Sequence, residues 1–227
     1  MVAAGQGTRL GASIPKALVA LSGRPLVGWC LNAFDRSADV RDIVVVAPPE
    51  IIGVFGDLGR DLSVPVRVVA GGPTRAESVA NGLAAVPPDR PLVMVHDAAR
   101  PLVTPAMVHA VLDAVGDGPG AILAAPVADT LKRVDDGHIV ESPSRDGLWG
   151  AQTPQAFRAD ALRDAVALAA AHGTLAQATD CASLVAAAGG AVRVVDPGGP
   201  NLKVTTPADL ALAEAILATR SEPDAVG

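Results

Sequence analysis

Residues 90–101 read RPLVMVHDAARP, an apolar run that ends in charged and small residues. The run is short and aliphatic, which is typical of a strand buried on both faces of a parallel sheet. His96, Asp97 and Arg100 follow where that strand would end. Comparable runs stand at DIVVVA (42–47), VPVRVVA (64–70), AILAAPV (121–127) and AVRVVD (191–196). We therefore expect polar groups to gather at the carboxyl ends of parallel strands.

Segments with apolar residues at helical spacing alternate with these runs. They are RPLVGWCLNAF (24–34), RAESVANGLAAV (75–86), TPAMVHAVLDAVG (104–116), ADALRDAVALAAAHG (159–173) and DCASLVAAAGG (180–190). A last helix is expected to begin at Thr206, with Pro207 in its first position and Asp209 in its first turn. The alternation predicts a Rossmann-like α/β fold with one doubly wound, mostly parallel sheet.

The alternation stops between residues 128 and 155, which read ADTLKRVDDGHIVESPSRDGLWGAQTPQ. A DDG turn between two extended pieces predicts a β-hairpin outside the sheet. Because the segment is polar, we expect a protruding arm over about residues 128–150.

The chain of 227 residues carries a net charge of -6 and has an isoelectric point near 5.1. It lacks the basic field that attracts nucleic acid or a membrane surface, so neither is an expected partner. Cys30 and Cys181 stand far apart without metal-ligand spacing, and no signal peptide or membrane-spanning run is evident, so we expect a cytoplasmic protein. The only lysines in the sequence are Lys16, Lys132 and Lys203.

The stretch AAGQGTR (3–9) is followed by Pro15 and Lys16. Its glycines can adopt positive φ and bring backbone N–H groups close to an anion, while Arg9 and Lys16 add positive charge. The stretch lacks the third glycine of a dinucleotide loop and the GK[ST] of a Walker loop. We interpret it as a triphosphate cradle in which Lys16 neutralises charge on an α-phosphate during nucleotidyl transfer. A flexible tail with a solvated lysine is the alternative.

Asp97 follows a predicted strand, where a carboxylate beside phosphates would need a cation. Mg²⁺ fits that role, because it binds one or two carboxylates together with substrate oxygens. A helix cap or an ion pair with Arg100 is the alternative for Asp97. His96 is expected to be packed or hydrogen-bonded, since no second histidine or cysteine stands at metal-ligand spacing.

AGGPTRAES (70–78) follows another predicted strand. Gly71 and Gly72 would let a flat base approach the backbone, and Arg75 and Ser78 would hydrogen-bond to base or ribose. An unliganded turn explains the glycines nearly as well.

Candidate groups for a second anion lie in the other half of the chain. They are Thr130, Lys132 and Arg145 in the expected arm, Thr153 after it, and Lys203 in an expected last strand at NLKVTT (201–206). Each alone is more often a surface residue. Together they suggest a phosphate-bearing second substrate held opposite the nucleotide.

These motifs together resemble the 2-C-methyl-D-erythritol 4-phosphate cytidylyltransferases of the non-mevalonate isoprenoid pathway. AAGQGTR, PK, GGPTRAES, HDAARP, APVADTLKR, RDGLWGAQTPQAF, TD and NLKVTTPADLALAEA occur in the family's order, nearly from end to end. The resemblance implies a single nucleotidyltransferase domain over residues 1–227, transfer of a cytidylyl group from CTP to methylerythritol phosphate, and release of pyrophosphate. It also implies a homodimer whose arms reach the partner's active site.

The resemblance assigns a role to each matching position. It implies transition-state roles for Arg9, Lys16 and Lys203, and a Mg²⁺ ligand in Asp97. The residues implied in nucleotide binding are Ala3, Ala4, Gly5, Gly7, Gly72, Arg75, Ser78, Ala98 and Arg100. Those implied in binding the acceptor substrate are Thr130, Arg145, Thr153, Thr179 and Lys203.

The chain departs from the family pattern at two places. A full strand normally precedes AAG, whereas Met1 and Val2 stand there, so either the start lies upstream or the central strand is clipped. Cys181 replaces an acidic residue after Thr179 and Asp180, and no role is expected for it. Ribitol-5-phosphate cytidylyltransferases, whose loop reads more like HDSVRP, and a non-catalytic nucleotide-binding protein on the same fold are the alternative functions.

Overall fold

The structure is a computed structural model that describes residues 1–5, 7 and 14–220. Two of the predicted strands, β3 (Ile43–Ala47) and β4 (Val66–Ala70), pair in parallel with Val45 opposite Val68. Branched side chains suit this pairing, because they pack well on a pleated surface covered by helices.

A second sheet has four strands in the order β10 (Val192–Val195), β6 (Gly120–Pro126), β9 (Trp149–Arg158) and β5 (Leu92–Val95). β10 and β6 are parallel, but β9 runs antiparallel to both of its neighbours. The expectation of a mostly parallel sheet is therefore wrong in this half of the molecule, where the sheet is mixed.

The sequence does not mark β9 as a strand, because WGAQTPQAFR contains polar residues and Pro154. Proline cannot donate to a ladder and lies in sheets at edges or bulges. The register between β6 and β9 shifts between Ile122 and Ala124, so residues 152–154 fall within the irregularity. This bulge accommodates the proline while the rest of β9 stays paired.

Residues 1–3, called the seam below, join the two sheets. Val2 forms parallel bridges with Val46 of β3 and with Asp97, just after β5, and its N–H donates to the carbonyl of His96 (2.7 Å). On the other side, the N–H of Ala3 donates to the carbonyl of Val46 (2.8 Å). The seam lies where a central strand would run. It connects the β3–β4 pair to the four-stranded sheet, and the three parts together are called the platform below.

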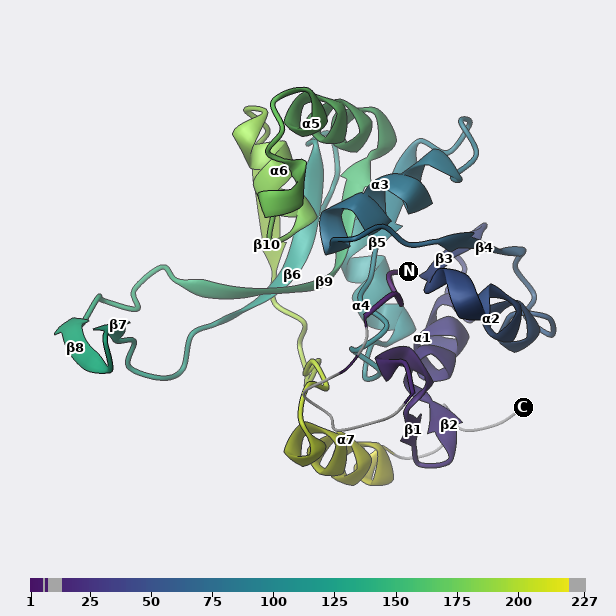
Figure 1. The fold of residues 1–227 in the computed structure, drawn as a ribbon, viewed down its shortest axis with the longest axis horizontal. Helices are drawn as coiled ribbons and strands as arrows, with labels where there is room; N and C mark the ends of the chain where they lie inside the picture. Colours follow the sequence, from purple (N-terminus) through teal and green to yellow (C-terminus); the bar gives the residue numbers. More distant parts are fainter. Residues whose placement is uncertain (6, 8–13, 221–227) are drawn as a thin grey trace.

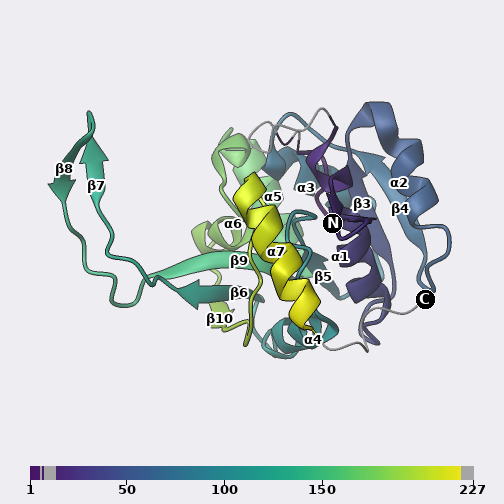
Figure 2. The ribbon, with the colours of Figure 1, turned by 90° about the horizontal axis from the view of Figure 1, so that it is seen from below.

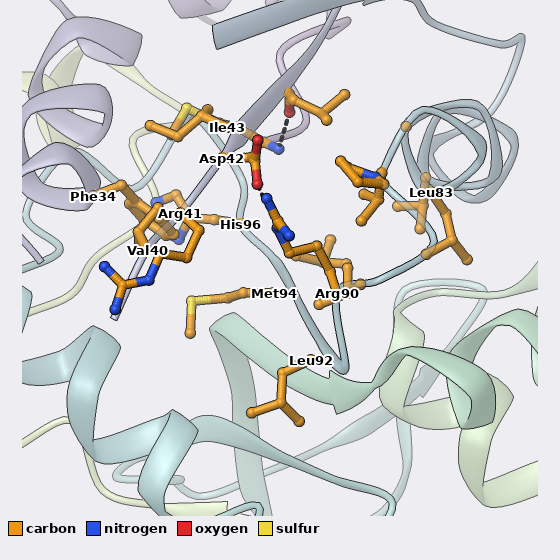
Figure 3. Close-up of a pocket in the computed structure, with 18 of the residues that line it drawn as sticks. Phe34, Val40, Arg41, Asp42, Ile43, Leu83, Arg90, Leu92, Met94 and His96 are labelled. Carbon is orange, nitrogen blue, oxygen red and sulfur yellow. Dashed lines mark hydrogen bonds and ion pairs between the residues drawn. The ribbon is translucent and has the colours of Figure 1, made fainter. Parts of the chain in front are cut away.

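A cavity of about 500 Å³, called the slot below, lies between β3 and β5 beside the seam (Figure 3). Apolar side chains from both helical layers and from β5 line it, among them Phe34, Leu83 and Met94. An ion pair between Arg90 and Asp42 (2.5 Å) connects the segments that lead into the two strands (Figure 3).

Helices cover both faces of the platform, as expected for a doubly wound fold (Figures 1 and 2). One face carries α1 (Leu26–Asp35), α2 (Ile52–Leu58) and α4 (Pro105–Asp113). The other carries α3 (Arg75–Ala84), α5 (Ala159–Ala171) and α6 (Cys181–Ala187). Their apolar side chains form two buried clusters with the strands between them.

A third, smaller cluster packs α7 (Pro207–Thr219) against the strand pair β1 (Ala20–Leu21) and β2 (Arg24–Pro25). Thr206 caps α7 as predicted, because its hydroxyl accepts from the N–H of Asp209 and the Asp209 carboxylate accepts from the Thr206 N–H. Residues 201–206 ahead of the helix form no strand, contrary to expectation.

Short 3-10 turns lie at Lys16–Leu18, Pro49–Ile51 and Leu175–Gln177. Within residues 1–5, 7 and 14–220, no helix is long and apolar enough to cross a lipid bilayer.

The segment expected to form an arm contains the antiparallel hairpin of β7 (Arg133–Asp135) and β8 (His138–Glu141). Asp136 and Gly137 form its turn with φ of 44° and 75°, as a two-residue hairpin loop favours. In Figure 1 the hairpin stands far from the platform and its helices. Its apolar side chains are more than half exposed: Val134, Ile139 and Val140.

Candidate active site

A cavity of about 670 Å³ opens at the carboxyl ends of the parallel strands. It lies among the loops that follow the seam, β3, β4 and β5. Its lining contains most of the predicted site residues: Ala3, Ala4, Gly5, Gly7, Lys16, Gly72, Arg75, Ser78, Asp97, Ala98 and Lys203. The topology thus brings these residues to the edge of the sheet where α/β folds bind ligands.

Gly7 and Lys16 are in close contact at one side of this cavity. Gly7 has a φ of 71°, and a side chain there would place its Cβ 2.7 Å from the Cβ of Lys16. Both the backbone conformation and the close approach therefore favour glycine. The N–H of Lys16 donates to the carbonyl of Gly5 (3.3 Å), and Arg9 lies outside the described residues.

The loop after β4 is shaped by its own hydrogen bonds. The N–H of Gly72 donates to the hydroxyl of Ser78 (3.0 Å), and that hydroxyl lies 3.3 Å from the Gly72 carbonyl. Ser78 is buried, so its hydroxyl holds the loop together. A Cβ on Gly71 would lie 2.7 Å from the Cβ of Ala4, which shows how closely the two glycine loops approach.

Asp97 lies between two cations. Its Oδ1 accepts from Nε (3.0 Å) and Nη2 (2.9 Å) of Arg75, and its Oδ2 accepts from Nζ of Lys203 (2.7 Å). Burial alone would raise the pKa of Asp97, but the Arg75 and Lys203 cations hold that pKa well below its ordinary value. Asp97 is therefore ionised, and its partners are Arg75 and Lys203 in place of the alternative, Arg100.

Arg75 also interacts with Cys181, at the start of α6. Burial raises the pKa of the Cys181 thiol to about 11, so the thiol is protonated at neutral pH. Cys181 therefore contributes no charge beside the ion pair of Arg75 with Asp97.

Arg100 is buried beneath the loop that carries Asp97, outside the cavity lining. Its Nη1 donates to the carbonyl of Asn201 (2.7 Å), and its Nη2 donates to that of Ala151 (3.4 Å). Burial lowers the pKa of Arg100, and its Nε has no hydrogen-bond partner among the described residues. A buried guanidinium held only by carbonyls retains unbalanced positive charge, which suits a nearby anion.

Asn201 is a buried residue next to the site that sequence reasoning misses. Its Nδ2 donates to the side-chain oxygen of Gln152 (2.9 Å) and to the carbonyl of Thr153 (2.9 Å). It thereby joins the segment before Lys203 to β9. The only sequence signal that could have pointed to Asn201 is its position directly before LKV.

Thr153 and His96 lie under the cavity and do not line it. The Asp97 N–H donates to the hydroxyl of Thr153 (3.0 Å), and that hydroxyl lies 3.2 Å from Nδ1 of His96. His96 is thus packed and hydrogen-bonded, as predicted.

The remaining predicted residues are exposed and do not line the cavity of this chain: Thr130, Arg145 and Thr179. Thr130 and Arg145 belong to the arm, where the guanidinium of Arg145 donates to the carbonyl of Ala128. Lys132 donates to the hydroxyl of Ser142 within the same arm (2.7 Å). A single chain therefore does not bring the arm residues to Asp97.

The family model for 2-C-methyl-D-erythritol 4-phosphate cytidylyltransferase matches residues 1–219. A curated protein of that name from Parasynechococcus marenigrum is 44% identical over 223 residues, covering 98% of each chain. Another from Frankia casuarinae is 48% identical, covering 97% of this chain and 80% of that one.

Solved structures agree with the sequence comparisons. A 2-C-methyl-D-erythritol 4-phosphate cytidylyltransferase from Thermus thermophilus superposes with a TM-score of 0.79 at 35% identity, covering 96% of this chain and 97% of that one. A 4-diphosphocytidyl-2C-methyl-D-erythritol synthase from Anaerococcus prevotii superposes with a TM-score of 0.81 at 27% identity, covering 96% and 95%.

Proposed function

Because this chain belongs to the 2-C-methyl-D-erythritol 4-phosphate cytidylyltransferase family, it transfers the cytidylyl group of CTP to 2-C-methyl-D-erythritol 4-phosphate, and we propose which of its residues do so. One observation carries the proposal: Lys16, Arg75, Asp97 and Lys203 line a single cavity at the carboxyl edge of the sheet. A cavity with these charges can hold a triphosphate and a second phosphate together.

In the proposed reaction, an oxygen of the acceptor phosphate attacks the α-phosphorus of CTP in line. The bond from that phosphorus to the bridging oxygen breaks, and pyrophosphate leaves with the electron pair. The protein positions the two substrates and neutralises the charge that develops, so it forms no covalent intermediate. Lys16 faces the phosphates of CTP, and Lys203 faces the incoming phosphate from its ion pair with Asp97. Arg9 lies outside the described residues, and the family pattern gives it a role at the same phosphates.

The glycine loops take the nucleotide in this proposal. Backbone groups of residues 3–5 and of Gly7 cradle the triphosphate, since Gly7 leaves room for close approach. The cytidine lies along the loops that contain Gly72, Arg75, Ser78, Ala98 and Arg100. The acceptor contacts Thr179 from the same chain, and Thr153, which is buried under the cavity, supports the acceptor site from below through its hydrogen bond with Asp97.

We further propose that Asp97 binds Mg²⁺ together with phosphate oxygens of CTP. Among the described residues no three histidine, cysteine or acidic side chains lie together as a metal site, and the carboxylates that line the cavity are Asp97 and Glu50. That donor set suits Mg²⁺, which often binds one or two carboxylates plus substrate phosphates. Asp97 is ionised, and its Oδ2 has Lys203 as its hydrogen-bond partner, which leaves a lone pair. Bound Mg²⁺ would supply charge neutralisation to the triphosphate.

A Mg²⁺ titration of pyrophosphate release tests this role. Asp97→Asn should raise the Mg²⁺ concentration for half-maximal rate at least about tenfold, because the amide loses the charge that attracts the metal. Asp57→Asn, which changes an exposed carboxylate on α2, should behave like the parent. An unchanged Mg²⁺ dependence in Asp97→Asn would remove Asp97 from the metal site.

The arm supports a proposal about assembly. Thr130 and Arg145 stand away from the cavity of their own chain, and apolar side chains of the hairpin are exposed. A two-fold homodimer would cover that apolar surface and deliver both residues to the partner's acceptor site. We also propose a cytoplasmic location, since Cys30 and Cys181 are both free thiols.

A further inference from the structure

His96 is a buried polar residue that the proposed chemistry leaves without a role. It lies at the end of β5 and is 1% exposed, and its ring packs against Phe34 with centroids 5.2 Å apart. Its Nε2 lies 3.3 Å from the carbonyl oxygen of Arg100, and its Nδ1 lies 3.2 Å from the hydroxyl of Thr153. Both ring nitrogens therefore have partners close to the active-site loop.

The direction of these hydrogen bonds follows from their chemistry. A carbonyl oxygen only accepts, so the proton of the neutral ring is assigned to Nε2, which donates to Arg100. Nδ1 is then an acceptor, and the Thr153 hydroxyl must donate to it. The Thr153 oxygen is left to accept the Asp97 N–H at 3.0 Å. Burial lowers the pKa of His96 to about 3, which keeps the ring neutral and this polarity intact at neutral pH.

This chain of bonds ties both ends of the turn over residues 97–100. Through Thr153, His96 holds the amide of Asp97; through Nε2, it holds the carbonyl of Arg100. A backbone bond from the Arg100 N–H to the Asp97 carbonyl (2.9 Å) closes the turn between them. The turn carries the carboxylate that holds Arg75 and Lys203.

We propose that His96 is a positioning residue for cytidylyl transfer: it fixes the turn of residues 97–100, and so the placement of Asp97 and Lys203, through the hydroxyl of Thr153. This inference rests on the proposed roles of Asp97 and Lys203. The inference requires that the hydrogen bond between the Thr153 hydroxyl and the His96 ring affects the rate of transfer, and not only the packing of the core.

The experiment compares His96→Phe with Thr153→Val and Thr153→Ser, and it uses His172→Phe on the surface as a control. Phe keeps the ring volume and removes both hydrogen bonds. We expect kcat to fall about tenfold to a hundredfold in His96→Phe and Thr153→Val, since a displaced group costs rate. The KM for CTP should rise in the same two variants, because the turn also carries Asp97, Ala98 and Arg100 of the proposed nucleotide site. Thr153→Ser keeps the hydroxyl and should restore most of the rate.

The double variant His96→Phe/Thr153→Val separates positioning from general destabilisation. If the two residues act as one chain, its kcat should match that of the worse single variant, whereas independent effects would multiply. In the unliganded protein, amide exchange at Asp97 should also quicken in His96→Phe, which tests the contact without any assay. A folded His96→Phe protein with parental kcat and parental exchange would overturn the inference. Where that variant does not fold, His96→Asn and His96→Gln, each of which keeps one hydrogen-bonding group, take its place with the same criteria.

The proposed role of Asp97 and the proposed positioning role of His96 can be contradicted independently of each other. Absence of a rate loss in Asp97→Asn would remove the role of Asp97 while the exchange result still reports on His96. Normal sensitivity in Asp97→Asn with parental behaviour in all His96 variants would remove only the positioning role.

Discussion

Asp97 is the residue on which the charges of the site converge. Its carboxylate holds Arg75 on one side and Lys203, more than a hundred residues away in sequence, on the other. Burying one carboxylate with two cations leaves net positive charge in the cavity, which favours an anionic ligand. Two of the three lysines of the chain, Lys16 and Lys203, line this cavity at the same edge of the sheet.

Lys16→Ala should slow catalysis far more than it weakens nucleotide binding. Loss of one preorganised positive group at a developing charge costs roughly 3 kcal/mol, or about two orders of magnitude in kcat. The Kd for CTP should rise less, because the glycine loop and the other cations remain. Steady-state rates at saturating substrate and a separate CTP binding titration check this. Arg60→Ala, an exposed cation on the surface, serves as the control; a kcat of Lys16→Ala within a few-fold of the parent would contradict it.

His96 should make the protein less stable as the pH falls. Its folded pKa of about 3 lies below the ordinary value of 6.5, so the unfolded chain binds more protons between those values and stability is lost as pH drops below about 6.5. Asp97, Arg100 and the Met1 amine are the charged groups that act on His96. Between pH 6 and 4.5 the slope should approach about 1.4 kcal/mol per pH unit.

Urea unfolding at several pH values within that window measures the slope. His96→Gln should flatten it, and His172→Gln should not. The Met1 amine, whose pKa burial lowers to about 6, adds a slope of the same sign mainly at higher pH. Parallel curves for the parent and His96→Gln would show that the ring titrates alike in the folded and unfolded chains.

At the scale of the elements, the seam is the narrowest part of the platform. Residues 1–3 are flanked by β3 and β5, and beside them the slot leaves about 500 Å³ between the two strands. The backbone groups of a parallel strand point alternately to its two sides, so Val44, which accepts from the Met1 amine (2.7 Å), also directs its N–H into this space. Apolar side chains from the helices on both faces of the platform line the slot, so it would fit a strand whose side chains are apolar on both faces.

An engineered extension of four apolar residues ahead of Met1, such as Val-Val-Ile-Val, should therefore raise stability. The free energy gained by burying about three side chains and forming the added backbone hydrogen bonds exceeds the entropic cost of ordering the extension by about 2 kcal/mol. That gain corresponds to a rise of about 5 °C in Tm for a chain of this size. A Gly-Ser-Gly-Ser extension is the matched control, because it also converts the buried Met1 amine to an amide. Equal Tm values for the two extensions would show that the slot does not accept a strand.

The sequence predicts some elements well and others poorly, for physical reasons. Branched apolar runs identify β3, β4 and β5, because burial on both faces demands such side chains. β9 is missed because its proline lies in a bulge that only pairing with β6 reveals. α2 is missed because Gly53 and Gly56 weaken its helical pattern. In the site, the predicted strand order places Asp97 and Lys16 at the same edge of the sheet. The contact of Thr153 with His96 cannot be predicted in this way, because it depends on β9, which the sequence does not mark as a strand.

At the scale of the whole molecule, the arm is the feature that one chain leaves unexplained. Its hairpin extends from the body, and Val134 and Ile139 on it are 57% and 64% exposed. Figure 2 shows the same separation from a second direction. Exposed apolar side chains on an isolated hairpin are typical of a surface that another chain covers.

Mixing two inactive proteins tests whether arms act between subunits. Thr130→Ala removes the hydroxyl of the arm, and Lys16→Ala damages the cradle. If the arm serves the partner, each heterodimer contains one site with an intact cradle and an intact arm. Random exchange should then restore about a quarter of the parental sites.

Mixing Lys16→Ala with Lys203→Ala is the matched control, since both residues line the same cavity and no heterodimer contains an intact site. Mass spectrometry of the mixture verifies that heterodimers form. Activity no greater than the sum of the parents, in the presence of heterodimers, would show that each arm serves its own chain or none.

The seam and the cradle are consecutive in the chain, since Ala3 donates to β3 and also lines the active-site cavity. Any fluctuation that separates β3 from β5 must therefore dismantle the nucleotide site in the same event. A ligand that occupies the cradle then raises the free energy of that opening by RT ln(1 + [L]/Kd), or about 2.7 kcal/mol at a hundredfold excess over Kd. If CTP binds there as proposed, we expect the two halves of the sheet to separate less often at higher CTP concentrations.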